Sequence, residues 1–100
     1  MATTSKALAR TAAATTTTTL YTVPSATTTV VTNIAVTNAA TSAGTFTITL
    51  DGIDLITAAS IAANSTAFFD VKQVLAATKV IAGFASATTV KFHISGVEIA

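Results

Sequence analysis

The chain has 100 residues, of which five are Lys or Arg and four are Asp or Glu, so its formal net charge is +1. Threonine and alanine occur 23 and 22 times, whereas cysteine and tryptophan are absent. This composition argues against a disulfide scaffold, a cysteine-ligated metal site, a cysteine nucleophile and a strongly basic nucleic-acid binder. The length suits one domain, and no apolar run approaches the roughly 20 residues of a membrane-spanning helix. We expect no membrane partner.

The first 19 residues form a low-complexity segment in which Met1 and Leu8 are the only large apolar side chains. Such a segment buries too little apolar surface to offset backbone ordering, which costs about 1–2 kcal/mol per residue. We therefore expect an extended N-terminal arm over residues 1–19, held by a partner, ahead of a domain over residues 20–100. A helix over residues 6–14 is the alternative, because Ala, Leu, Arg and Lys favour helix.

From residue 20 onward, apolar and polar residues alternate with a period of two, which is typical of half-buried strands. In the first long strand, Val30, Ile34 and Val36 are expected to face the core and Val31 to face outward. The clearest alternation follows in residues 45–50, where Phe, Ile and Leu alternate with Thr. The pair Asp51-Gly52 then predicts a tight hairpin turn and a short returning strand over residues 53–56.

The second half continues the strand pattern. Residues 65–71 predict a strand with Phe68 and Phe69 on opposite faces, and residues 73–78 a single helical turn. A strand over residues 79–86 is expected to turn Ile81 outward. In the last strand, residues 90–99, a bulge at Ser95-Gly96 would return Val97 and Ile99 to the core face. The inward set comprises Leu20, Val30, Ile34, Val36, Phe46, Ile48, Leu50, Phe69, Val71, Val80, Phe84, Val90, Phe92, Ile94, Val97 and Ile99.

Seven or eight short strands separated by turns predict an all-β fold, an antiparallel β-sandwich of jelly-roll or immunoglobulin-like type with an extended N-terminal arm. Three apolar side chains, Val31, Phe68 and Ile81, fall on faces expected to point outward. One interpretation is an alternation phase that is off by one residue. The other is a subunit interface, because outward apolar side chains on a small β domain mark association surfaces.

The predicted interface also includes residues of the arm. Lys6 and Arg10 give the arm a charge of +2, which suits an acidic partner surface, and Leu8 is its apolar anchor. Homo-oligomerisation, for example as a trimer with each arm on a neighbour, would account for the arm and the outward apolar side chains together. Two cations are too few for stable nucleic-acid binding.

No catalytic, cofactor-binding or metal-binding residues are predicted. His93 is expected on the surface beside Lys91, without the additional ligands that a metal site needs. Asp51 and Asp54 are interpreted as turn residues, because two carboxylates fall short of a calcium site. Nothing in the context of Asp70 or Glu98 predicts a catalytic pair, so we expect no enzyme activity and no cofactor.

Four stretches, Leu20-Tyr-Thr-Val-Pro24, Val30-Val-Thr-Asn-Ile34, Phe46-Thr-Ile-Thr-Leu-Asp-Gly52 and His93-Ile-Ser-Gly-Val-Glu-Ile99, carry a resemblance. On these strand and turn patterns the chain resembles small β-sandwich structural proteins of tailed bacteriophages. The resemblance implies a virion component made in the host cytoplasm and located on the capsid surface, a decoration or cement protein. Its partners would be itself and the major capsid protein or other virion proteins.

Two alternatives remain open at this point. The chain is a tail, baseplate or fibre subunit in the first, and a carbohydrate-binding adhesion module in the second. The second rests on Tyr21 and Phe68 as exposed aromatic side chains. If the arm carries attachment to the capsid, deletion of residues 1–19 should abolish attachment and leave the sandwich folded.

Overall fold

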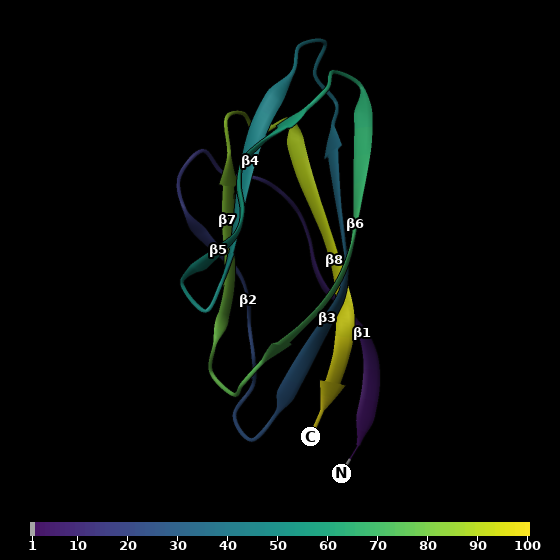
Figure 1. Ribbon diagram of the computed structural model, residues 1–100, viewed down its shortest axis with the longest axis vertical. Coiled ribbons are helices and arrows are strands. Elements are labelled where there is room, and N and C mark those ends of the chain that lie inside the picture. The colour runs from purple at the N-terminus through teal and green to yellow at the C-terminus, as the bar shows by residue number, and fades with distance from the viewer. Residues whose placement is uncertain (1) are drawn as a thin grey trace.

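A computed structural model describes residues 2–100 as two antiparallel four-stranded sheets packed face to face (Figure 1). Threonine, valine and isoleucine, whose branched side chains favour extended backbone, are frequent in the strands. The strands are β1 (Thr3–Ala12), β2 (Thr18–Thr22), β3 (Thr28–Asn38), β4 (Gly44–Leu50), β5 (Ile53–Ile61), β6 (Ser65–Leu75), β7 (Val80–Ala85) and β8 (Val90–Ile99). The predicted all-β class and β-sandwich are therefore confirmed.

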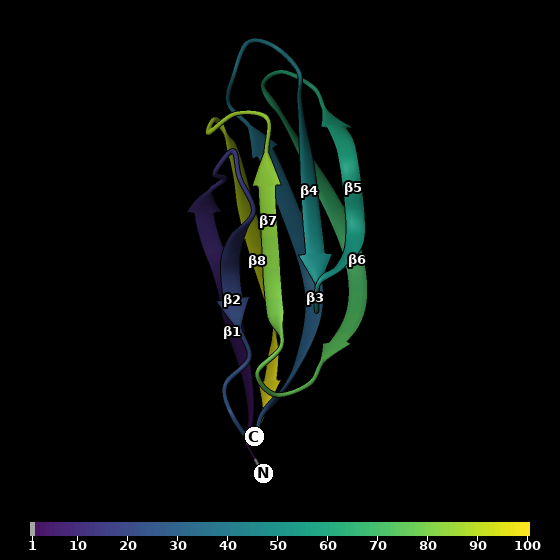
Figure 2. The ribbon, with the colours of Figure 1, turned by 90° about the vertical axis from the view of Figure 1, so that its left-hand side faces the viewer.

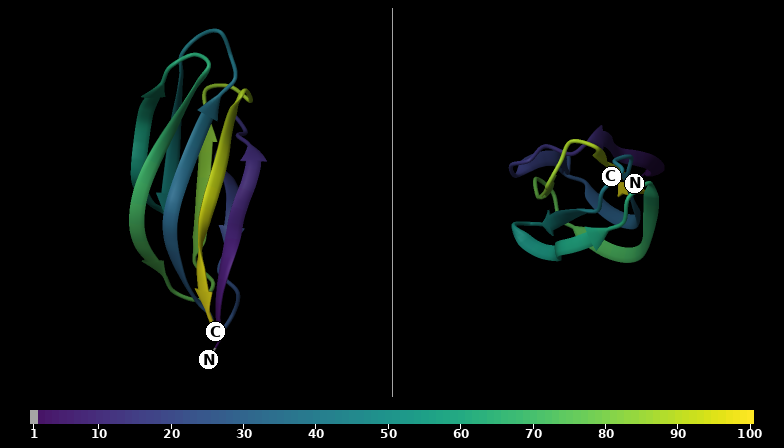
Figure 3. Two further views of the ribbon diagram at one scale, coloured as in Figure 1. Left: turned by 90° about the vertical axis from the view of Figure 1, so that its right-hand side faces the viewer. Right: turned by 90° about the horizontal axis from the view of Figure 1, so that it is seen from above.

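The first sheet, sheet A, has the strand order β1-β8-β3-β6, and the second, sheet B, has the order β2-β7-β4-β5. Four antiparallel ladders are nested within one another along the chain: β4 pairs with β5, β3 with β6, β2 with β7 and β1 with β8. The sandwich is long and narrow, 46 × 21 × 17 Å, and Figure 3 shows its two ends and its two layers.

The innermost ladder begins at the predicted hairpin turn. Asp51 and Gly52 have φ angles of 55° and 75° and join β4 directly to β5. Gly adopts such angles without steric cost and Asp tolerates them better than most residues, which is why this pair forms a two-residue hairpin. The returning strand is longer than predicted, because it continues to Ile61 instead of ending at residue 56.

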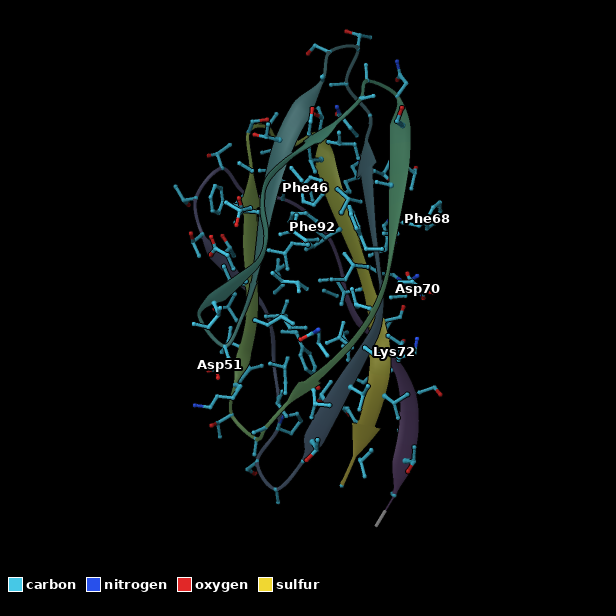
Figure 4. All side chains as sticks on the ribbon, in the orientation of Figure 1. Phe46, Asp51, Phe68, Asp70, Lys72 and Phe92 are labelled. Atoms are coloured by element: carbon cyan, nitrogen blue, oxygen red, sulfur yellow. The ribbon has the colours of Figure 1, made fainter. Side chains whose placement is uncertain are left out.

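The core lies between the sheets and centres on two aromatic rings. Phe46 of β4 and Phe92 of β8 meet edge to face with their ring centroids 6.2 Å apart (Figure 4). Among the predicted inward side chains, eight are buried: Ile34, Val36, Phe46, Ile48, Leu50, Val90, Phe92 and Ile94. Each such side chain contributes about 1.5–3 kcal/mol to stability by leaving water.

The N-terminal segment differs from the prediction of an arm outside the domain. Residues 3–12 form β1, which pairs with β8 along its length and buries Leu8 and Ala9. Ala13 is buried just beyond it, and residues 18 and 19 begin β2. The segment is extended, as expected, but it is part of the sandwich, because backbone pairing and small alanine side chains replace the large apolar ones it lacks. Met1 lies outside the described residues.

In the part of β3 that precedes Thr32, the residues that face the core are not the ones predicted. Thr29 and Val31 are buried, and beyond Thr32 the buried positions are Ile34 and Val36, so the inward set steps by three residues instead of two. The register of both ladders of β3 shifts between Val31 and Asn33 at this point. Such an irregularity inverts the alternation on one side of it. The prediction that Val31 faces outward is therefore wrong.

Along the whole of β7, the residues that face the core are the opposite set from those predicted. Ile81 and Ala85 are buried, whereas Val80 and Phe84 are only partly buried. Gly83 lies on the inward face, where an added Cβ would be 2.9 Å from the Thr47 carbonyl oxygen and 3.5 Å from the Phe92 ring. Gly83 leaves space that the Phe92 ring of the other sheet fills, and the larger Phe84 lies on the opposite face of the strand.

The predicted bulge at Ser95-Gly96 in β8 is also wrong. The extra residue lies in each neighbouring strand instead. The register with β8 shifts between Ala7 and Ala9 of β1 and between Val31 and Asn33 of β3. Gly96 is buried between these strands, and a Cβ on it would stand 2.3 Å from the Val30 carbonyl oxygen. Glycine is needed here for a close approach of backbones.

The segment over residues 73–78, predicted as a helical turn, continues β6 to Leu75 and then turns. Its first three residues extend the alternation of the strand, and Leu75 is buried. Within residues 2–100 we find no helical segment with the length and apolar character required to span a bilayer.

Candidate interaction surface

Within residues 2–100, the large apolar side chains that remain exposed lie on two strands, β5 and β6. In the described part of the chain they are Ile53 of β5, which is 72% exposed, and Phe68 and Val74 of β6, which are 74% and 68% exposed. Ordinary surfaces carry such side chains singly and scattered. All three belong to two strands that follow one another in the chain, so these strands are the candidate surface for binding another molecule.

These two strands run along one side of the sandwich (Figure 2). β6 is the outermost strand of sheet A and β5 the outermost strand of sheet B, so each is hydrogen-bonded to a neighbour on one flank only. An edge strand presents backbone N–H and C=O groups that another chain can pair with. This side of the molecule, which we call the β5–β6 edge, therefore offers both apolar side chains and free backbone groups.

The outward side chains of β6 follow the strand period of two. Phe68, Asp70, Lys72 and Val74 are exposed, whereas Phe69 and Val71 between them pack against the core. Figure 4 shows Phe68, Asp70 and Lys72 projecting away from the sandwich on the outer side of sheet A. The strand therefore displays two opposite charges flanked by two apolar side chains on a single face.

The far edge of the sandwich holds a polar cluster between the two sheets. The hydroxyl of Tyr21 on β2 donates to the carboxylate of Glu98 on β8 and lies 2.9 Å from the Thr29 hydroxyl on β3. Lys6 of β1 places its Nζ 3.4 Å from the same carboxylate. The cluster joins β2 of sheet B to three strands of sheet A.

The ionisation of this cluster is set by its own hydrogen bonds. Donation from Tyr21, and the neighbouring Lys6 ammonium, lower the pKa of Glu98 below its ordinary value. Burial, followed by the hydrogen bond to Glu98, raises the pKa of Tyr21. The carboxylate is ionised and the phenol neutral around neutral pH, which is the combination in which the hydrogen bond between them forms. The arrangement serves to hold the sheets together.

The six residues predicted for an interface do not form one surface. Leu8, Val31 and Ile81 are core side chains, so their predicted place in an interface is wrong for this fold. Lys6 is bound to Glu98, and Arg10 is exposed on β1 opposite His93 in the register of the β1–β8 ladder. Only Phe68 lies on the β5–β6 edge.

The other chemistry-bearing residues are also dispersed. His93 is exposed on β8, as predicted. Asp51 lies in the hairpin turn, 3.6 Å from the ammonium of Lys79, and Asp54 accepts a hydrogen bond from Thr57. Within residues 2–100 no group of three or more His, Cys, Asp or Glu side chains is placed to hold a metal ion, and no cavity is found.

Two residues of the β5–β6 edge, Ile53 and Val74, were not anticipated from the sequence. If the alternation of β6 is continued from Phe68 in steps of two, Val74 faces outward. The prediction of a helical turn over residues 73–78 ended the strand before this residue. The aromatic pair proposed for carbohydrate binding is not assembled either, because the Tyr21 hydroxyl is bound within the cluster at the far edge.

Comparisons with protein-family models, with curated proteins and with solved structures find no match for this chain.

Proposed function

We propose that the chain is a non-enzymatic structural subunit that associates with copies of itself and with a larger protein shell. In its most specific form the proposal is a tailed-bacteriophage protein that decorates and stabilises the capsid. The observation that carries it is the β5–β6 edge, whose two strands carry the exposed side chains of Ile53, Phe68 and Val74 and are each paired on one flank only. Apolar side chains beside free backbone groups favour binding to a protein surface.

The strand order supports the choice of a virion. We favour the eight-stranded jelly-roll type over the immunoglobulin-like one, because the four ladders are nested and consecutive strands change sheet except at the β4–β5 hairpin. Jelly rolls occur in viral capsids, although the same architecture also occurs in lectins and enzymes. The strand order therefore adds weight to a function that the exposed edge suggests.

The charge content supports association as well. Nine charged residues among 100, with a net charge of +1, leave little electrostatic repulsion between copies. Proteins with a net charge near zero associate more readily than strongly charged ones. A subunit that functions within an assembly benefits from this property.

The test is the location of the native chain in purified particles. An antibody against the chain, applied to separated head and tail fractions of phage particles from the producing culture, should detect it on heads. Detection on tails only would favour a tail, baseplate or fibre subunit and overturn capsid decoration. Absence from both fractions, with the chain soluble in the lysate, would overturn the virion role.

A further inference from the structure

We propose that β6 pairs with β6 of a second copy, antiparallel and centred on Val71, so that two sheets A join into one continuous sheet. The inference rests on the self-association in the proposed function and names the surface that carries it. β6 is an eleven-residue edge strand without proline, so it presents a long row of free backbone groups with which another strand can pair. Its ladder with β3 shifts register between Asp70 and Gln73, so Val71 and Lys72 lie at a local irregularity of the strand.

The outward face of β6 is complementary to itself when the strand is reversed. With two copies antiparallel and centred on Val71, Asp70 faces Lys72 of the second copy, and Phe68 faces its Val74. By two-fold symmetry each pair occurs twice. Directly opposite side chains on antiparallel strands have Cβ atoms about 4.5–5.5 Å apart, which places the charges and the apolar groups in contact.

The charges also exclude the neighbouring registers. A pairing centred on Asp70 would oppose the two Asp70 carboxylates, and one centred on Lys72 would oppose the two ammonium groups, both of which are destabilising. A pairing centred between residues would align the outer face of one sheet with the inner face of the other. A parallel pairing in register would again bring like charges together. Only the register centred on Val71 satisfies all four outward side chains.

Neither Asp70 nor Lys72 forms an ion pair with another residue in the described part of the chain. Both are exposed, so they are available to a partner. On the inward face, the same register brings the partly buried Val71 of each copy together and sets Phe69 opposite Gln73. The two-fold axis stands perpendicular to sheet A, so both sheets B lie on the same side and turn their β5 edges toward each other.

The test is a charge exchange read by sedimentation equilibrium of the full chain. Wild type should be in monomer–dimer equilibrium. Asp70→Lys and Lys72→Asp should each weaken the dimer by about tenfold or more, because each changes two facing pairs from attraction to repulsion. An equimolar mixture of these two variants should dimerise like wild type, as should the double variant D70K/K72D, because each again pairs unlike charges.

Lys91→Asp is the matched control, since it makes the same charge change at an exposed position of β8 in the interior of sheet A. It should leave dimerisation unchanged, and circular dichroism of every variant should match wild type because all three positions are exposed. A wild type that is monomeric at all concentrations would overturn the pairing. So would dimers that are unaffected by Asp70→Lys, or single variants that fail to recover on mixing.

The outcome is separable from that of the proposed function. A dimer with these charge responses that is absent from purified particles would retain the pairing and overturn the virion role. A chain that is present on heads but monomeric in solution would do the reverse.

Discussion

Replacing Gly96 by alanine should destabilise the fold more than any other single-methyl addition at a glycine of this chain. The new Cβ would lie 2.3 Å from the carbonyl oxygen of Val30 and 3.0 Å from Leu8 Cδ1. The Val30 oxygen belongs to backbone in the ladder between β3 and β8, so it cannot move aside without separating the two strands. Overpacking that forces backbone shifts costs about 1–3 kcal/mol or more, and we expect about 3 kcal/mol here.

For a domain of this size, 1 kcal/mol corresponds to a change in Tm of about 4–8 °C, so Tm should fall by about 12–24 °C. The assay is thermal unfolding followed by circular dichroism, with urea unfolding at 25 °C for the free energy. Both are run at one protein concentration, because self-association shifts Tm.

Gly44→Ala is the control substitution. Its Cβ would meet side-chain atoms only, the closest being the Ser86 hydroxyl at 3.1 Å, so rotation of this side chain relieves the contact at the cost of the hydrogen bond that it accepts from the Thr45 N–H. We expect a loss below about 1 kcal/mol. The reasoning is refuted if Gly96→Ala is as stable as wild type, or if Gly44→Ala loses as much stability, because the position of the backbone oxygen would then not decide the cost.

Three further predictions concern the edges and the core phase. Deletion of residues 2–12 should unfold the chain, seen as loss of amide dispersion in NMR spectra, because it removes a full strand of sheet A; a folded product would restore the idea of a separable arm. The free energy of unfolding should fall as pH drops through the lowered folded-state pKa of Glu98, whose contribution is fully present above its ordinary value of 4.5, and Glu98→Gln should reduce this fall. The raised pKa of Tyr21 acts in the opposite direction: its contribution to stability is present below its ordinary pKa of 10.0 and is lost as pH rises through its folded-state pKa. Equal urea stability of wild type and Glu98→Gln at every pH would contradict the role of the cluster. Val31→Asp should abolish folding by burying an unpaired carboxylate, whereas Val30→Asp at the partly exposed neighbour should be tolerated, and similar melting curves for the two would show that the phase of β3 is misplaced.

Local sequence signals predicted the β4–β5 hairpin well. The alternation ending at Leu50 and the turn residues Asp51 and Gly52 are adjacent in the chain, so neither depends on distant contacts. The same holds for the alternation from Val90 to Ile94, whose apolar members are all buried.

Faces that depend on distant neighbours were not predictable from one strand alone. β7 carries apolar residues on both faces, and its phase is decided by Gly83, which lies close to the Thr47 carbonyl of the neighbouring strand β4 and to the Phe92 ring of the other sheet. In β3 the phase changes at Thr32, where the ladders to both neighbouring strands shift register. Nothing in the local alternation of either segment encodes these contacts.

The sequence does not predict β1 as a strand of the core, because residues 1–19 contain few large apolar side chains. β1 contributes mainly Leu8, Ala9 and the backbone hydrogen bonds of its ladder with β8. The sequence predicts only part of the β5–β6 edge. Phe68 was identified as an outward apolar side chain, but its neighbours on the edge depended on how far β6 and β5 extend.

The central place of β8 in sheet A affects how the chain can be made. β8 is the last strand in sequence, yet it alone joins β1 to β3. During synthesis on the ribosome, the first strand therefore waits without its partner until residues 90–99 have left the exit tunnel. Sheet A is then completed in a late step that brings the two ends of the chain together, and such distant contacts form slowly.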